Sequence, residues 1–399
     1  MKKLWTFVNI ILGIGYGIFL GIMVINAIIF NETLTIEKKL LFLILILIMF
    51  FLSNYLCTII HESGHLIFGL ISGFRFISFR IGSTIFLKDQ KSNKIKKKKY
   101  FMAGTGGQCI LDTPKDETKK PFVLYNLGGV FLNLIFAVIN GVIYIFVKEL
   151  IIGYFFLFMM LQNILMIILN GIPLRSNYID NDGYNTKQIS KSNLAKEAFY
   201  AQIKITKATT NNIRLKDMDE SFFLFDQELT EKNSMVSTIK LFRIERLIDE
   251  HKYLEAIEDL KLLLNDDTLA GIYQNTVKSD LIFCYLVTNN KELAEKYIDK
   301  GFKNMLKMKM PVPNMIRYKY TYYLLLENDV EKASAERTYL AQIEEKYPYK
   351  ADFEGELEQI NVAKEVYLAN QNGLQKGVTL RDFNWIFYKT DWIKVNFML

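Results

Sequence analysis

The sequence contains little histidine, cysteine or tryptophan, with three residues of each among 399. Cys57, Cys109 and Cys284 show no paired spacing, which excludes a disulfide framework. The net charge of +7 is modest, and its strongest local source is "KSNKIKKKKY", Lys91–Tyr100. No aromatic residues alternate with these basic residues, so a nucleic-acid partner is not expected. The segment instead indicates a solvated loop close to anionic lipid head groups.

Four apolar stretches are long enough to cross a bilayer, which takes about 20 residues, and the only Asp, Glu, Lys, Arg or His side chains in them are His61, Glu62 and His65 of the second stretch. The stretches are Leu4–Asn31, Leu40–Gly73, Pro121–Val147 and Leu150–Leu174. The first is too long for a signal-peptide core, and no small-residue cleavage site follows it. We therefore expect an α-helical polytopic membrane domain over residues 1–186, followed by an all-α soluble domain over residues 187–399.

Basic residues are distributed unevenly among the connections. The connection between the second and third stretches holds ten lysines and two arginines, whereas those after the first and third hold three lysines together. Because basic residues stay on the cytoplasmic side, we predict a cell-membrane protein with a cytoplasmic N-terminus and C-terminal domain. His61 and His65 then lie in the cytoplasmic half of the second span.

Two of the three histidines lie inside this second apolar stretch, in "HESGH", His61–His65. Ionisable residues in a membrane are costly and usually functional. At a spacing of four residues, both rings project from one helix face and can bind one ion. Glu62 can act as a general base, as in the H-E-x-x-H arrangement of zinc proteases. The alternative is a chance match, with both histidines hydrogen-bonded inside a helical bundle.

A catalytic zinc ion needs a third protein ligand. Cys57 lies on the same helix face as His61 and is one candidate, although a small buried apolar role suits it better. Asp180 and Asp182 follow the fourth stretch at its predicted cytoplasmic end, and their spacing alone does not separate them. Gly183 favours Asp182, because glycine lets the backbone turn and approach a metal closely. Asp180 suits a hydrogen-bond acceptor for a ligand histidine or a plain helix-end carboxylate.

Together, the H-E-S-G-H and the later Asn-Asp-Gly resemble the site-2 protease family of intramembrane zinc metalloproteases, over roughly residues 40–186. The zinc ligands that the resemblance implies are His61, His65 and Asp182. It also implies that Glu62 is the catalytic base. The family's Gly-x-x-x-Asn element has a counterpart in Gly129 and Asn133, which implies a catalytic place for Asn133 near substrate or oxyanion. Two departures are "IDNDG" instead of Leu-Asp-Gly and the lack of a PDZ insert.

The residues after the histidine motif alternate as strands do. Phe74–Lys88, "FRFISFRIGSTIFLK", is rich in β-branched and aromatic residues. The resembling family has a short re-entrant sheet here, whose edge could receive a substrate in extended form. The glycine cluster Ala103–Cys109 lacks the lysine and serine of a phosphate-binding loop, so we expect a flexible loop.

The second half repeats a helical pattern. Segments centred on Ala256, Ala294 and Ala333 are 38 and 39 residues apart, which suits helical hairpins of the tetratricopeptide (TPR) type. Such stacks present a surface to a peptide or protein partner. Because the diagnostic Trp, Gly and Pro positions are mostly missing, an ordinary helical domain without a ligand is the alternative.

These observations predict an intramembrane zinc endopeptidase that cleaves a membrane-embedded or leader-bearing peptide with zinc-activated water. A membrane-anchored peptide-binding or assembly protein with a structural or vestigial metal site is the alternative. Glu62 favours the enzyme, because a structural zinc site has no use for a base. The abundance of Lys, Ile and Asn is typical of an AT-rich genome such as that of a low-GC bacterium. There, secreted-peptide maturation and regulated proteolysis of an anti-sigma factor are equally open.

Overall fold

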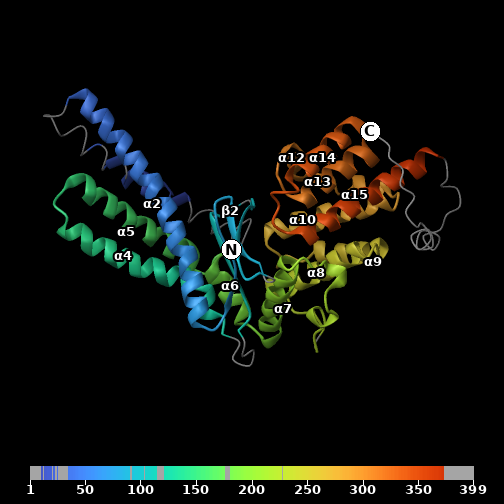
Figure 1. The fold of residues 1–399 in the computed structure, drawn as a ribbon, viewed down its shortest axis with the longest axis horizontal. Coiled ribbons are helices and arrows are strands. Elements are labelled where there is room, and N and C mark those ends of the chain that lie inside the picture. The colour runs from blue at the N-terminus through green and yellow to red at the C-terminus, as the bar shows by residue number, and fades with distance from the viewer. Residues whose placement is uncertain are drawn as a thin grey trace.

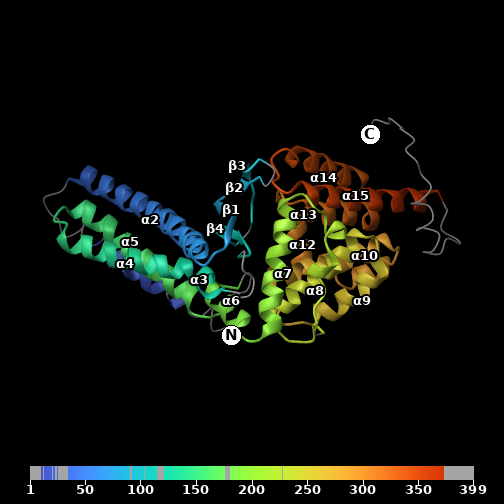
Figure 2. The same cartoon turned by 60° about the horizontal axis from the view of Figure 1, so that its bottom comes forward.

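The computed structural model describes residues 10–11, 13–19, 21–22, 25, 35–89, 92–102, 104–114, 121–175, 180–226 and 228–372. Most of the first predicted span lies outside the described residues, although its described positions are helical. The described chain forms an apolar helical arm, a small central sheet and a helical body (Figures 1 and 2).

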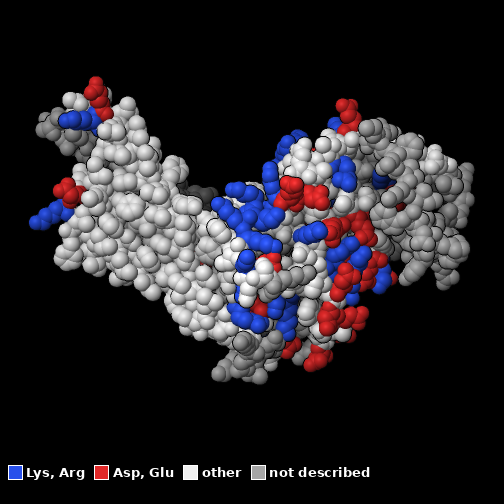
Figure 3. Space-filling model, in the orientation of Figure 1, with Lys and Arg blue, Asp and Glu red and all other residues white. Residues whose placement is uncertain are grey.

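The arm consists of α2 (Ile36–Ile71), α4 (Gly128–Phe146) and α5 (Leu150–Gly171). Within the described residues, these three helices are long and apolar enough to cross a membrane. They match the second, third and fourth predicted stretches, and α4 and α5 form a hairpin with a short turn. On the face shown in Figure 3, charged side chains are nearly absent from the arm except at its outer tip.

Glycines allow the helices of the arm to touch through their backbones. A Cβ atom added to Gly128, at the start of α4, would lie 2.5 Å from the carbonyl oxygen of Gly64 in α2. A Cβ atom added to Gly129 would lie 2.5 Å from Cε1 of His61. The start of α4 therefore packs directly against the histidine motif of α2.

The sheet is antiparallel, with the strand order β3-β2-β1-β4. Its strands are β1 (Arg75–Ile81), β2 (Thr84–Lys88), β3 (Ile95–Lys99) and β4 (Gly107–Asp112). Two expectations are wrong here. The lysine-rich segment forms the exposed edge strand β3, where charged side chains protect a sheet edge. Gly107–Cys109, expected in a loop, begins β4, because its backbone pairs with β1.

Short helix α3 precedes α4, and the remaining helices form the body. Their bounds are α3 (Val123–Asn126), α6 (Asp182–Ile189), α7 (Asn193–Thr210), η1 (Leu215–Asp217), η2 (Glu220–Phe222), α8 (Ser234–Asp249), α9 (Tyr253–Leu264), α10 (Gly271–Val287), α11 (Lys291–Glu295), α12 (Lys300–Lys307), α13 (Pro313–Thr321), η3 (Tyr322–Leu326), α14 (Val330–Ile343) and α15 (Lys350–Gln371).

The repeated sequence pattern falls on three helical hairpins, α8–α9, α10–α11 and η3–α14. Each turn contains one non-glycine residue with positive φ: His251 (60°), Asn289 (59°) and Asn328 (56°). Five residues later, each second helix buries a small side chain against the hairpin: Ala256, Ala294 and Ala333. The same turn conformation thus recurs at the spacing seen in the sequence.

The sheet and the body share one core. Ile85 of β2 is fully buried in the cluster formed mainly by α8–α15. The ring of Tyr100 lies 6.1 Å from Tyr347 and 5.2 Å from Tyr349, measured between centroids. On the other side, β4 packs against α2 and α7. The predicted boundary between residues 186 and 187 falls inside α6. The sheet precedes this boundary, but it packs against helices on both sides of it.

The glycine contact between α2 and α4 can be tested with a matched pair of variants. Gly128→Ala should destabilise the protein by about 1–3 kcal/mol, because its methyl group would meet backbone that cannot yield. Gly141→Ala in the same helix should be tolerated, since its methyl would meet only the flexible side chain of Met160 at 3.1 Å. Thermal melting in detergent measures both, and equal melting temperatures would contradict the contact.

Candidate metal centre

Three side chains from two elements converge where the arm meets the body. His61 and His65 lie one helical turn apart in α2, and Asp182 is the first residue of α6. Oδ2 of Asp182 lies 3.1 Å from Nε2 of His61 and 3.3 Å from Nε2 of His65. The two Nε2 atoms are 3.3 Å apart. The group could hold a metal ion, and no other His, Cys, Asp or Glu group among the described residues converges in this way.

Hydrogen bonds behind the histidines set the direction of both rings. Nδ1 of His61 lies 2.7 Å from Oδ1 of Asn133, and Nδ1 of His65 lies 2.8 Å from the carbonyl oxygen of Tyr125. Both partners are acceptors, so both Nδ1 atoms carry a proton and donate it. The orientation of Asn133 is fixed because its Nδ2 donates to Oδ1 of Asn163 at 2.6 Å. The Nε2 lone pairs therefore face Asp182.

Asn133 lies beside the candidate metal centre. Both groups of its amide are engaged, one with His61 and the other with Asn163. It therefore orients a ligand ring, and its amide is not directed toward an open substrate position. Asn163 also donates to Sγ of Cys57 at 3.1 Å, which places that thiol among polar groups behind the cluster. Cys57 is thus not a ligand in this arrangement.

Sequence reasoning missed Asn163, which lies in an apolar helix and belongs to no motif. The signal in the sequence was its polarity, because Asn163 and its neighbour Gln162 are polar residues in the middle of the apolar helix α5, and the structure buries both. A polar side chain inside an apolar bundle needs a partner. Asn163 finds partners in Asn133, Cys57 and the carbonyl oxygen of Met159.

A bridging asparagine positions Asp182. Asn181 caps the start of α6, with Oδ1 accepting from the backbone of Tyr184 at 2.8 Å. Its Nδ2 donates to two carbonyl oxygens at the end of α5, each at 2.7 Å. Gly183 does not have positive φ, so the expected tight glycine turn is wrong. Its lack of a side chain instead lets α6 touch the backbone of Gly171.

The two aspartates near α6 have separate surroundings. Asp180 faces Arg175, with Oδ1 of Asp180 3.6 Å from the arginine Nε, and it does not join the histidines. Burial alone would raise the pKa of Asp182, but the two imidazoles outweigh burial and hold it below its usual range. The chain turns at Asn181, and this turn sends the two carboxylates in different directions.

Glu62 lies beside the cluster and against the sheet. It is buried and close enough to His65, His61 and Asp182 to interact with them electrostatically. A Cβ atom added to Gly107 of β4 would lie 2.7 Å from Oε1 of Glu62. Only a glycine at the start of β4 permits this contact, so the strand and the carboxylate are packed together.

The donor set fits a cation better than a hydrogen-bonded cluster. The buried Oδ2 of Asp182 faces the two Nε2 atoms at 3.1 and 3.3 Å and has no other hydrogen-bond partner among the described residues. Without a cation, both Nε2 atoms would have to carry protons to face this oxygen favourably. Since both Nδ1 atoms already donate, two imidazolium rings would then meet at 3.3 Å. A metal ion removes this repulsion and uses all three lone pairs.

Metal content distinguishes the two aspartates. Asp182→Asn should lose most of the bound metal, because two histidines alone hold an ion weakly. Asp180→Asn, two residues away, should keep about one ion per chain, since this aspartate faces Arg175. Elemental analysis of the purified proteins checks both. An empty Asp180→Asn protein beside a fully loaded Asp182→Asn protein would reverse the assignment.

The bond from Asn133 to His61 can be tested in the same way. Asn133→Ala should weaken metal affinity about 10–100-fold, because His61 loses the acceptor that sets its ring. Asn140→Ala is the control, since Asn140 is also buried in α4 but bonds only the carbonyl oxygen of Phe136. Competition with a chromophoric chelator measures both affinities. Equal affinities in the two variants would show that the Asn133 bond is unimportant.

Comparison with known proteins identifies no relative of this chain. No protein-family model, curated protein or solved structure matches it. The function must therefore be inferred from the chemistry of the cluster and its surroundings.

Proposed function

We propose that the protein is an intramembrane zinc metalloendopeptidase that resembles the site-2 protease family. The observation that carries the proposal is the convergence of His61, His65 and Asp182 beside the buried Glu62. The two histidines and Glu62 lie on a helix that is long and apolar enough to cross a membrane. A base next to a candidate metal site inside an apolar arm suits hydrolysis in a membrane.

Zinc is supported by the spacing of the donor atoms. Nitrogen and oxygen ligands lie about 2.0–2.2 Å from a tetrahedral zinc ion, so neighbouring ligands are roughly 3.3 Å apart. The three distances in the cluster are 3.1, 3.3 and 3.3 Å. With three protein ligands, a bound zinc ion would still be able to take a water or substrate ligand, as catalytic sites require.

His61, His65 and Asp182 would hold the ion, and Glu62 would move the proton. When bound, zinc polarises a peptide carbonyl and lowers the pKa of a coordinated water. The Glu62 carboxylate would accept a proton from the attacking water and deliver it to the leaving amide nitrogen. Burial of Glu62 against Gly107 keeps this carboxylate near the three ligands.

The sheet offers a way to present a peptide. A helical peptide hides its scissile bond in its own hydrogen bonds, so it must become extended before cleavage. Among the described strands, β4 is at one edge of the sheet, and its Gly107 adjoins Glu62. A substrate added along β4 would pass the candidate site in extended form.

The membrane arrangement and the body complete the proposal. Residues 4–31 would add a fourth span to the three described helices. The lysine-rich sheet would face the cytoplasm beside anionic lipid, as basic residues do. The three hairpins of the body would form a TPR-like stack that binds a substrate or protein partner. The substrate would be a membrane-embedded or leader-bearing peptide, cleaved in regulated proteolysis or in secreted-peptide maturation.

Replacing the proposed base separates chemistry from metal binding. Glu62→Gln should retain the fold and the zinc but lose cleavage, because an amide cannot accept the proton. Glu37→Gln, at the exposed start of the same helix, should cleave normally.

Mass spectrometry of peptides that accumulate in cells with Glu62→Gln, but not with Glu37→Gln, would identify substrates. The purified wild-type protein should then cut those peptides in a chelator-sensitive reaction. Normal cleavage by the Glu62→Gln protein would show that Glu62 is not the base.

A further inference from the structure

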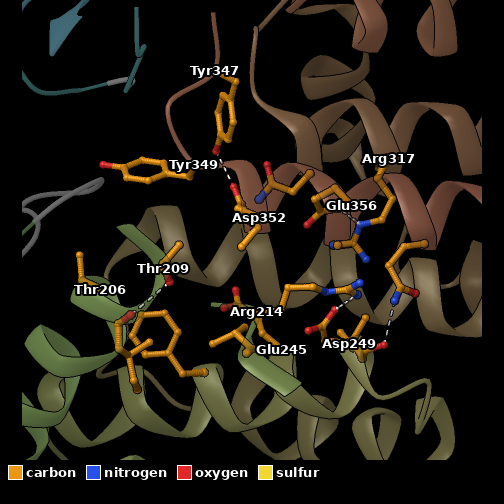
Figure 4. Close-up of a pocket in the computed structure, with 18 of the residues that line it drawn as sticks. Thr206, Thr209, Arg214, Glu245, Asp249, Arg317, Tyr347, Tyr349, Asp352 and Glu356 are labelled. Carbon is orange, nitrogen blue, oxygen red and sulfur yellow. Dashed lines mark hydrogen bonds and ion pairs between the residues drawn. The ribbon is translucent and has the colours of Figure 1, made fainter. Parts of the chain in front are cut away.

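A polar cavity lies on the side of β4 that faces away from Glu62. It has a volume of about 350 Å³ and is lined by β4, the segment after β3, and helices of the body including α7, α8, α10, α13 and α15 (Figure 4). Gln108 and Ile110 of β4 line it. Successive side chains of a strand point to opposite faces. Gly107, next to Gln108, adjoins Glu62, so one strand separates the cavity from the candidate metal centre.

Carboxyl groups outnumber cations in the lining. The five acidic residues are Glu245, Asp249, Asp280, Asp352 and Glu356, and the two basic residues are Arg214 and Arg317. Arg214 pairs with Asp249, and Arg317 pairs with both Asp280 and Glu356. No described cation forms an ion pair with Glu245 or Asp352. The lining therefore has an excess of negative charge when its carboxyls are ionised.

Several buried polar atoms in this lining lack partners. Asp280 is 1% exposed, and its Oδ2 has no hydrogen-bond partner, although its Oδ1 accepts from Arg317 and Tyr318. Oδ1 of Asn314 is also buried without a partner. Buried polar atoms are normally satisfied. These acceptors are thus free to receive a donor that enters the cavity.

Burial raises the pKa of several carboxyl groups in the lining. It raises the pKa of Glu356 to about 8, despite the neighbouring Arg317. Burial also raises the pKa of Glu245 well above its usual range. A cation placed among these groups would favour their ionised forms.

The arrangement suits an organic cation on a flexible stem. A metal ion is disfavoured, because no three acidic groups of the cavity converge as the histidine cluster does. Tyr100, Tyr318, Tyr347 and Tyr349 add aromatic walls that can contact an aliphatic stem and a cation. The volume lies at the small end of ligand pockets, which is enough for one long side chain.

We propose that this cavity binds a lysine or arginine side chain of a peptide substrate that lies along β4. The inference rests on the proposed function and adds a substrate class to it. Because Gln108 and Ile110 lie one and three residues beyond Gly107, the basic residue would lie a few residues from the bond that is cut.

Binding tests the proposal without requiring cleavage. The full chain carrying Glu62→Gln, in detergent, is titrated with a blocked, fluorescently labelled peptide, Gly-Val-Thr-Arg-Thr-Val-Gly, and with its citrulline counterpart. Citrulline keeps the shape of arginine but not the charge. We expect the arginine peptide to bind about tenfold more tightly, which is 1.4 kcal/mol.

Two further variants locate the effect. Glu245→Gln should cut the preference for arginine to below threefold, and this change leaves no broken pair, because no described residue forms an ion pair with Glu245. Glu255→Gln removes the same charge from the exposed face of α9, outside the cavity, and should keep the preference. Circular dichroism verifies that both variants are folded.

Equal affinity for the two peptides, or an unchanged preference in Glu245→Gln, would overturn the proposal. If spermidine binds more tightly than the arginine peptide, the occupant of the cavity is a free polyamine and the proposal of a peptide side chain is wrong. If the wild-type protein cleaves nothing but the preference for arginine holds, the cavity binds a basic side chain as proposed and the protease proposal is wrong.

Discussion

Close backbone contact at glycine is the constraint on which the candidate site depends. The ligands come from α2 and α6, and each must approach within about 3.3 Å of the others. Gly128 and Gly129 let α4 pack closely against the histidine motif, and Gly183 lets α6 pack closely against the end of α5. Any larger side chain at these points would separate the helices by more than the geometry of one ion tolerates.

A line of hydrogen bonds reinforces this packing. It runs from His61 to Asn133 and Asn163, and it ends at Cys57 one turn back along α2. The line therefore joins α2, α4 and α5 through polar groups inside an apolar arm. In such surroundings a hydrogen bond is strong and an unpaired group is costly. The same bonds that orient a ligand ring therefore specify how the three helices pack.

The sequence predicts the parts of this structure that local chemistry controls. Apolar length marks α2, α4 and α5, helical spacing pairs His61 with His65, and the recurring alanines mark the hairpins of the body. Contacts between distant segments were harder to foresee. Asn133 looked like a substrate-facing residue because its partner Asn163 is 30 residues away in another helix. The segment of β3 was expected to be a loop because its run of lysines lacks the alternating pattern of a strand, and its backbone is paired only by β2.

The core shared by sheet and body has a consequence for the order of synthesis. Ile85 leaves the ribosome about 150 residues before α8, whose side chains help to bury it. At translation rates of about 5–20 residues per second, this interval is roughly 7–30 s. For that time the sheet has an uncovered apolar face. The arm and β4 can therefore pack early, because β4 lies against α2 and α7, whereas β2 is covered only after the helices from α8 onward have been made.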